Sequence, residues 1–175
     1  MGYYIKLEES NAALKAADLP EVLKRLHTMD KYEPLKSGGS YSNGGKIASW
    51  YAWMPRDLSE LTTVQDFLEQ VGFEVELDND LLVFNGYDSK TGCEQEFIWA
   101  IAPFIVLAEK ETDAKHPYMV WRGEDGSTWR WSFVDGAMVE QSAIVTWQDE
   151  KEYNPKEFGG TFTLTREMLE ADVRA

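Results

Sequence analysis

The sequence has few of the residues on which covalent and metal chemistry usually depends. Its 175 residues include one cysteine, Cys93, and two histidines, His27 and His116. A single cysteine cannot close an intramolecular disulfide, and no Cys or His pair has the spacing of a zinc site. Neither histidine has a serine or cysteine neighbour with a recognisable catalytic signature. We therefore expect a protein without catalytic residues, metal or cofactor.

Long hydrophobic runs and positive charge are also scarce. The longest apolar stretch, residues 99–108, is far shorter than the roughly 20 residues that span a bilayer. The opening residues alternate too much for a signal-peptide core. The chain carries 17 Lys and Arg against 31 Asp and Glu, a net charge of −14. This balance disfavours direct binding to nucleic acid or to an anionic membrane, and we expect a cytoplasmic protein.

The chain is instead rich in aromatic residues and in acid. It contains seven Trp, eight Tyr and eight Phe, and rings of this size bury enough surface to make disorder unexpected. The acid is unevenly distributed, because residues 51–100 contain 11 acidic and 2 basic residues, whereas residues 1–50 contain 6 and 7. A general aid to solubility would be more even, so the distribution slightly favours an acidic binding surface.

Three segments have helix signals. Asp18 with Glu21 predicts a capping box, and apolar residues recur behind it at helical spacing. Thr62 with Gln65 predicts a second helix start in the same way. A third helix is expected over residues 93–102.

Strands are expected at residues 3–8, 47–54, 73–77, 81–84, 118–122 and 128–134, then from the turn after residue 134 up to about 147, and at 161–165. Residues 47–54 are apolar on both faces, which favours a strand that is covered on both sides. The glycine-rich stretch 37–45 lacks the Gly-Lys-Ser/Thr ending of a phosphate-binding loop. We expect that stretch to be a flexible loop.

The strands near the end of the chain form a meander whose turns set the register. In the first hairpin, pairing Arg122 with Ser127 would place Trp129 and Trp131 in the core and leave Trp121 on the other face.

In the second hairpin, a two-residue loop would set Trp131 opposite Glu140. A three-residue loop with Gly136 as a bulge avoids this, so burial favours the bulge. We expect a single α+β domain over residues 1–150, a two-layer sandwich with a mainly antiparallel sheet, three helices and a C-terminal β-meander. Residues 151–175 are expected to be an extension with a short strand and a helical turn.

Candidate binding residues are therefore few. Asp78 and Asp80 resemble the start of a calcium loop, but its later glycine and glutamate are missing. We expect a plain turn there. The residues proposed for binding are the acids of the charged region and a small patch of Trp and Arg: Glu69, Glu74, Glu76, Asp78, Asp80, Trp121, Arg122, Glu124, Asp125 and Arg130.

Three stretches resemble a known group of proteins. These are Met1 to Tyr4 (MGYY), residues 86–92 (GYDSKTG) followed by Glu94, and residues 121–126 (WRGEDG) followed by Trp129. Together they are similar to small uncharacterised proteins of tailed bacteriophages and prophages, over roughly residues 1–147. The resemblance implies the cytoplasm of an infected bacterium. A host protein is the partner we expect from the acidity together with the lack of a catalytic signature. It transfers no catalytic residue.

Two hypotheses of different kinds follow. In the first, the chain is a non-enzymatic phage accessory protein that inhibits a host defence or nucleic-acid-handling factor through an acidic face, including as a DNA mimic. In the second, it is a module that binds a nucleotide or signal molecule with Trp121, Arg122, Arg130 and the loop at 37–45. A hydrolase that uses surface carboxylates has the least support, because no buried carboxyl pair is indicated.

Overall fold

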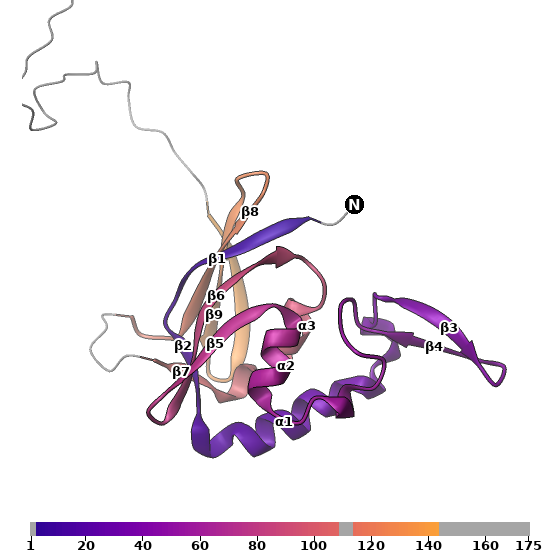
Figure 1. The fold of residues 1–175 in the computed structure, drawn as a ribbon. Helices are drawn as coiled ribbons and strands as arrows, with labels where there is room; N and C mark the ends of the chain where they lie inside the picture. The colour runs from indigo at the N-terminus through magenta and orange to yellow at the C-terminus, as the bar shows by residue number, and fades with distance from the viewer. Residues whose placement is uncertain (1–2, 109–113, 144–175) are drawn as a thin grey trace, which may run out of the picture. The chain divides into compact units, whose positions relative to one another are not determined.

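The computed structural model describes residues 3–108 and 114–143 (Figure 1). The strand expected at 161–165 lies outside the described residues. The helices are α1 (Leu19–Thr28), α2 (Val64–Val71) and α3 (Glu94–Ile101), and short 3-10 helices are η1 (Ala16–Asp18), η2 (Met29–Lys31), η3 (Glu33–Leu35), η4 (Leu58–Glu60) and η5 (Ala102–Phe104). The strands are β1 (Tyr4–Ser10), β2 (Ala12–Lys15), β3 (Gly39–Asn43), β4 (Lys46–Trp50), β5 (Phe73–Asp78), β6 (Leu81–Lys90), β7 (Ile105–Leu107), β8 (Tyr118–Gly123), β9 (Thr128–Val134) and β10 (Ala137–Ser142).

The main sheet is organised around β6. Its eight strands are ordered β10-β9-β8-β1-β6-β2-β7, with β5 on the other side of β6, and every pair is antiparallel. β1 and β2 form one line of chain that is interrupted at Asn11. The Asn11 side-chain oxygen accepts a hydrogen bond from the Tyr118 N–H at 2.7 Å, and its backbone carbonyl accepts one from Ala108 at 2.8 Å. Asn11 thus joins the two halves of the sheet.

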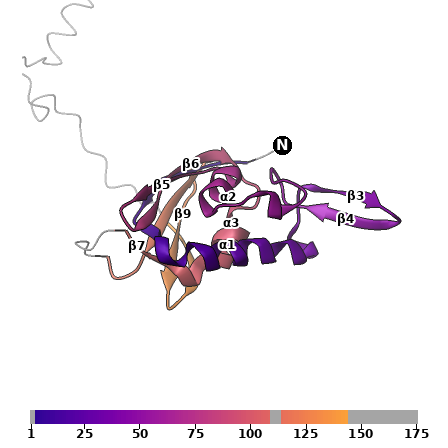
Figure 2. The same ribbon diagram turned by 60° about the horizontal axis from the view of Figure 1, so that its bottom comes forward.

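The core lies between one face of this sheet and the three helices, as Figures 1 and 2 show. The α+β class and the mainly antiparallel sheet are as expected from the sequence. Phe67 of α2 and Phe97 of α3 meet edge to face with ring centroids 4.9 Å apart, and both side chains are fully buried. The other face of the sheet carries polar and charged side chains together with partly buried Val83, Val120 and Val134.

The aromatic core contains a residue that the sequence analysis placed on the surface. Trp121 is fully buried, with ring centroids 4.6 Å from Trp131, 5.4 Å from Tyr87 and 5.9 Å from Phe73. Its Nε1 has no hydrogen-bond partner among the described residues. The prediction of an exposed Trp121 was wrong.

The first hairpin turn explains that error. Arg122 pairs with Thr128, one residue further along than expected, so Trp121 lies opposite Trp129. The loop is Glu124 to Gly126, and Gly126 has a positive φ of 82°. This geometry is that of a three-residue hairpin loop with a glycine bulge. The one-residue shift moved every side chain of β8 to the other face.

The second hairpin has the loop that the sequence analysis rejected. Asp135 and Gly136 both have positive φ, 50° and 76°, and Val134 pairs with Ala137, which is a two-residue loop. Glu140 therefore lies opposite Trp131, and its carboxylate accepts a hydrogen bond from the Trp131 Nε1 at 2.9 Å. Burial did not exclude this register because β10 is an edge strand, where Glu140 remains exposed.

The glycine-rich stretch is a hairpin rather than a flexible loop. β3 and β4 form a separate two-stranded sheet, and a Cβ atom at Gly38 would lie 2.6 Å from the Trp50 ring. The Arg56 guanidinium also lies over these rings, 5.4 Å from the Trp50 ring centroid and 4.5 Å from that of Tyr41. The expectation of a strand covered on both sides was also wrong, because Ile47 is 79% exposed.

The helix ends agree only in part with the capping signals. The Asp18 side chain makes no capping hydrogen bond, since the chain enters α1 through η1. The cap of α2 is Thr63, one residue later than expected, and its hydroxyl accepts a hydrogen bond from the Asp66 N–H. Gly72 ends α2 with a φ of +118°.

Candidate functional site

The acidic residues proposed for binding do not form one surface. Glu74, Glu76 and Asp78 alternate along the outward face of β5, with Asp80 in the turn that follows, whereas Glu69 lies on α2. The row of acids on β5 ends at Asp78, which pairs with Leu81 at the start of β6.

Glu124 and Asp125 lie at the far end of β6. Their hairpin loop bonds to Tyr3 and to Tyr4, which pairs with Lys90. Asp78 is level with Leu81 and lies about 30 Å from the Lys90 end of β6, whereas Glu74 is level with Gly86 and lies about 13 Å from that end. The row on β5 and the hairpin loop are therefore separate groups whose members lie at different distances from each other along the sheet.

Asp125 has a clear structural role. Its carboxylate accepts hydrogen bonds from the Tyr3 hydroxyl at 2.5 Å and from the Ser127 N–H at 2.9 Å. The hydrogen bond from Tyr3, followed by those from Ser127, lowers the pKa of Asp125 to about 2. These contacts fasten the first strand to the hairpin loop.

The two arginines of the proposed patch lie on the outward face of the sheet, away from Trp121. Arg122 is directly opposite Lys6 on β1. Arg130 donates a hydrogen bond to the Gln141 side chain at 2.6 Å and lies 6.0 Å from the Tyr118 ring centroid. The patch therefore lacks the tryptophan that was expected to provide a stacking surface.

A groove that was not expected from the sequence is lined by residues of α1, α3 and the β9–β10 hairpin. Figure 2 shows α3 beside α1. Its volume is about 400 Å³, which falls within the usual range for small-molecule sites. Its lining residues are Arg25, Thr28, Met29, Tyr32, Trp99, Ala100, Ala102, Pro103, Gly136, Ala137 and Met138.

Two aromatic rings that have no aromatic partner among the described residues line this groove. Trp99 is 59% exposed and Tyr32 is 51% exposed. Within residues 3–108 and 114–143, neither ring contacts another aromatic ring or a cation. The exposed Trp53, in contrast, lies against the backbone of Gly92, where a Cβ would be 2.6 Å from its ring. Tyr32 and Trp99 are therefore available to a ligand.

Trp99 is held by a helix whose other sides are buried. Phe97, Ile98 and Ile101 of α3 are in the core, so position 99 points outward. The start of α3 is fixed by the buried Glu94, whose carboxylate accepts a hydrogen bond from the Gly92 N–H at 2.7 Å. The position of Trp99 between buried helix residues is a feature of the sequence that could have indicated an exposed ring.

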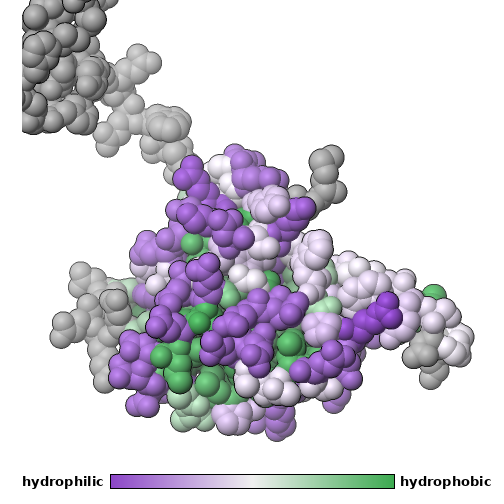
Figure 3. Space-filling model, in the orientation of Figure 1, coloured by the Kyte–Doolittle hydropathy of each residue, from purple (hydrophilic) through white to green (hydrophobic). Residues whose placement is uncertain are grey.

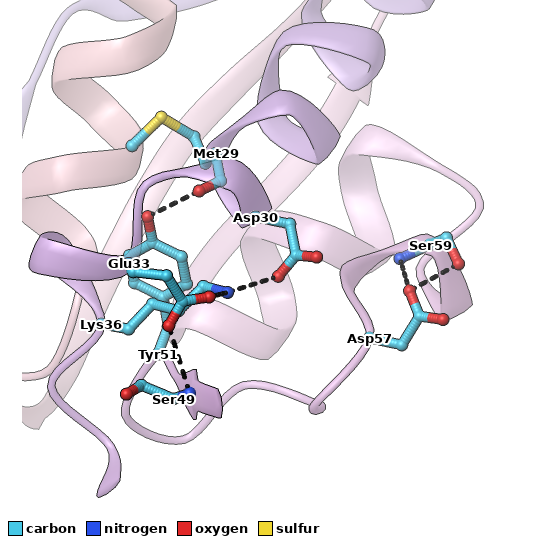
Figure 4. Close-up of polar contacts among 8 residues, drawn as sticks. All are labelled: Met29, Asp30, Glu33, Lys36, Ser49, Tyr51, Asp57 and Ser59. Atoms are coloured by element: carbon cyan, nitrogen blue, oxygen red, sulfur yellow. Dashed lines mark hydrogen bonds and ion pairs between the residues drawn. The ribbon is translucent and has the colours of Figure 1, made fainter. Parts of the chain in front are cut away.

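Tyr32 is held by the turn between η2 and η3, shown in Figure 4. The Lys36 ammonium, on a side chain that is 5% exposed, lies 3.0 Å from the Asp30 carboxylate and 2.7 Å from that of Glu33. The Tyr51 hydroxyl donates a hydrogen bond to the Met29 carbonyl at 2.9 Å. Tyr32 lies between these anchored residues in the chain.

The pKa shifts in this turn follow from the same contacts. The hydrogen bond from Lys36 and that from the Ser49 N–H lower the pKa of Glu33. Burial opposes the charge of Lys36, but its hydrogen bonds to Glu33 and Asp30 outweigh burial and raise the pKa of Lys36. Burial raises the pKa of Tyr51 to about 12. Lys36 is therefore charged and Tyr51 neutral at neutral pH.

A second groove is apolar and shallow. It lies between α1, the start of α2 and β5, and Leu19, Leu23 and Leu77 are among its lining residues. Apolar residues show in the lower part of the face in Figure 3, broken up by hydrophilic ones. This groove has no charged lining residue among those the structure describes, and it offers no aromatic ring.

The described residues contain no group of three His, Cys, Asp or Glu side chains placed to hold a metal ion. Among the same residues, no helix is long and apolar enough to span a membrane. Comparison of the chain with protein-family models, with curated proteins and with solved structures gives no match.

Proposed function

We propose that the chain is a non-enzymatic binding protein that captures a small ligand with a planar ring in the Tyr32–Trp99 groove. The observation that carries the proposal is the pair of half-exposed rings that share one groove and have no aromatic partner within the described chain. Rings of this kind stack on a base or another flat ring, and each stack contributes roughly 1–3 kcal/mol. Binding should lose little conformational entropy, because the backbones of α3 and of the turn between η2 and η3, which carry the two rings, are already fixed.

Ligand screening by thermal shift tests this proposal. The panel consists of nucleobases, nucleosides, nucleotides and aromatic amino acids, and a ligand at 100 times its Kd should stabilise the fold by about 2.7 kcal/mol. Trp99→Ala should weaken binding roughly 5- to 150-fold, which corresponds to one lost stack.

Trp53→Ala is the matched control. Trp53 is 61% exposed but is not among the lining residues of the groove, so its loss should leave binding unchanged. A panel in which no compound shifts the melting temperature would refute the proposal. Equal losses in the two tryptophan variants would refute the placement of the site.

The acidic inhibitor is a second proposal, now limited to the β5 edge. Glu74, Glu76 and Asp78 are on one row of an edge strand, so their charges can meet a basic partner together. Charge on an edge strand also blocks unwanted strand pairing, which would explain the row without a partner. If the resemblance to phage proteins holds, the partner would be a host protein in the cytoplasm of an infected bacterium. Purified basic candidate proteins should bind the wild type. They should lose binding to the triple variant Glu74→Gln, Glu76→Gln, Asp78→Asn, and also at high salt (about 0.5 M), where the Debye length falls to about 4 Å.

A further inference from the structure

The groove has one residue that stacking alone does not explain, Arg25 of α1. Among the described residues that line the groove, it is the one that carries a charge. It lies at the rim of a site in a chain of net charge −14. We infer that the groove selects ring ligands that also carry an anionic group, such as a phosphate or carboxylate, and that Arg25 binds that group. This inference rests on the proposed function.

The ion pairs around α1 leave Arg25 unneutralised. Lys24 lies 3.4 Å from Glu21, and Lys36 contacts two carboxylates. Within residues 3–108 and 114–143, no carboxylate lies within ion-pair distance of Arg25 or Lys31, and of these two only Arg25 lines the groove. An anion in the groove would therefore meet a cation that need not give up another partner.

The position of Arg25 is not explained by the end of the helix. Basic residues near a helix C-terminus often bond to its last carbonyls. In α1 the carbonyls of Leu26 and His27 accept from the Met29 N–H instead. The Arg25 guanidinium lies over the ring of Phe104, 5.8 Å from its centroid. This cation–π contact restrains the side chain beside the groove, which reduces the entropy lost when it binds an anion.

An arginine is also the suitable cation for this task. Its planar guanidinium presents paired donors that match a carboxylate or phosphate. The ring of the ligand would stack on Trp99 or Tyr32 while the anion bonds to Arg25, and all three side chains line the same groove of about 400 Å³. That volume suits one ring with one short anionic group better than a polymer.

Matched ligand pairs separate this inference from the proposed function. The probes are adenosine, guanosine, cytidine and uridine, each beside its 5′-monophosphate, titrated by calorimetry into wild type, Arg25→Gln and Lys24→Gln. Lys24→Gln makes the same change of charge one residue away, at a side chain that does not line the groove. A melting curve without ligand checks that each variant folds.

We expect the wild type to bind at least one monophosphate about tenfold more tightly than its nucleoside, the lower end for a charge-assisted bond at an open site. Arg25→Gln should remove that preference and leave nucleoside binding unchanged, whereas Lys24→Gln should keep most of it. Equal affinity for nucleoside and monophosphate, or a preference that survives Arg25→Gln, overturns the inference but leaves the proposed function standing. Absence of binding by all eight compounds overturns the inference, and the proposed function falls with it if the nucleobases and aromatic amino acids of the first panel also fail to bind.

Discussion

Replacing Gly72 by alanine should strain the backbone and the core at the same time. Gly72 ends α2 at a φ of +118°, a conformation that costs a residue with a side chain about 1–2 kcal/mol. A Cβ there would lie 2.9 Å from the Tyr87 ring. That ring is 2% exposed and is packed against Phe73 and Trp121, so it cannot move aside. Overpacking of this kind costs about 1–3 kcal/mol more.

Gly126→Ala is the matched control for Gly72→Ala. Gly126 also has a positive φ, +82°, but nothing lies within 4 Å of its Cβ position. Gly126→Ala should lower the free energy of unfolding only by the backbone cost, about 1–2 kcal/mol, whereas Gly72→Ala should lower it by about 2–5 kcal/mol in total. Urea unfolding followed by tryptophan fluorescence measures both, and the m-value should not change. If Gly72→Ala costs no more than Gly126→Ala, the close packing of Tyr87 against Gly72 is incorrect.

Three further predictions concern single side chains. Tyr3→Phe removes the main cause of the low pKa of Asp125. A carboxyl whose pKa is lowered by folding stabilises the fold at pH values above its ordinary pKa of 3.8, and this stabilisation is lost as the pH falls toward 2. The melting temperatures of wild type and Tyr3→Phe should therefore differ at pH 5 and approach each other near pH 2, and a constant gap would contradict this. Burial raises the pKa of the Cys93 thiol, so native protein should resist iodoacetamide at pH 8 and react in urea; fast labelling without urea would show an open site. Trp121→Ala should cost about 3–5 kcal/mol in urea unfolding, and a cost below about 1 kcal/mol would mean that the ring is not in the core.

The fold class could be predicted because long apolar patterns do not depend on distant residues. The spacing of Val22 and Leu26 indicates one buried helix face wherever α1 packs, and both side chains are buried. The alternation of Phe73 and Val75 with glutamates identifies β5 in the same way. Gly72 marks the helix end because few other residues adopt its φ.

Register and burial in the meander could not be predicted, because each turn sequence is compatible with two loop lengths. Glu124 to Gly126 and Asp135-Gly136 both end in glycine, and a glycine can serve as a bulge or as the second residue of a tight turn. Knowing that β10 is an edge strand would have made Glu140 acceptable opposite Trp131, but strand order is a property of the whole fold. One residue of error then placed Trp121 on the wrong face.

The groove was missed for a related reason. Arg25, Tyr32, Trp99 and Gly136 come from three separate parts of the chain, and no local spacing relates them. The sequence does place Trp99 on the outward side of its helix, which distinguishes it from the buried Phe97. The sequence gives no indication that Tyr32 lines the same groove as Trp99.

The pairing of β1 has a consequence for how the protein is made. β1 occupies the middle of the sheet, between β6 and β8, yet it precedes both of them in the chain. These partners are complete only at Lys90 and Gly123, so at about 5–20 residues per second Ile5 and Leu7 wait roughly 4–17 s for β6 and roughly 6–23 s for β8. During that time the nascent chain presents apolar strand residues without a sheet to receive them. Refolding from denaturant, in which all of these strands are present from the start, does not impose this delay.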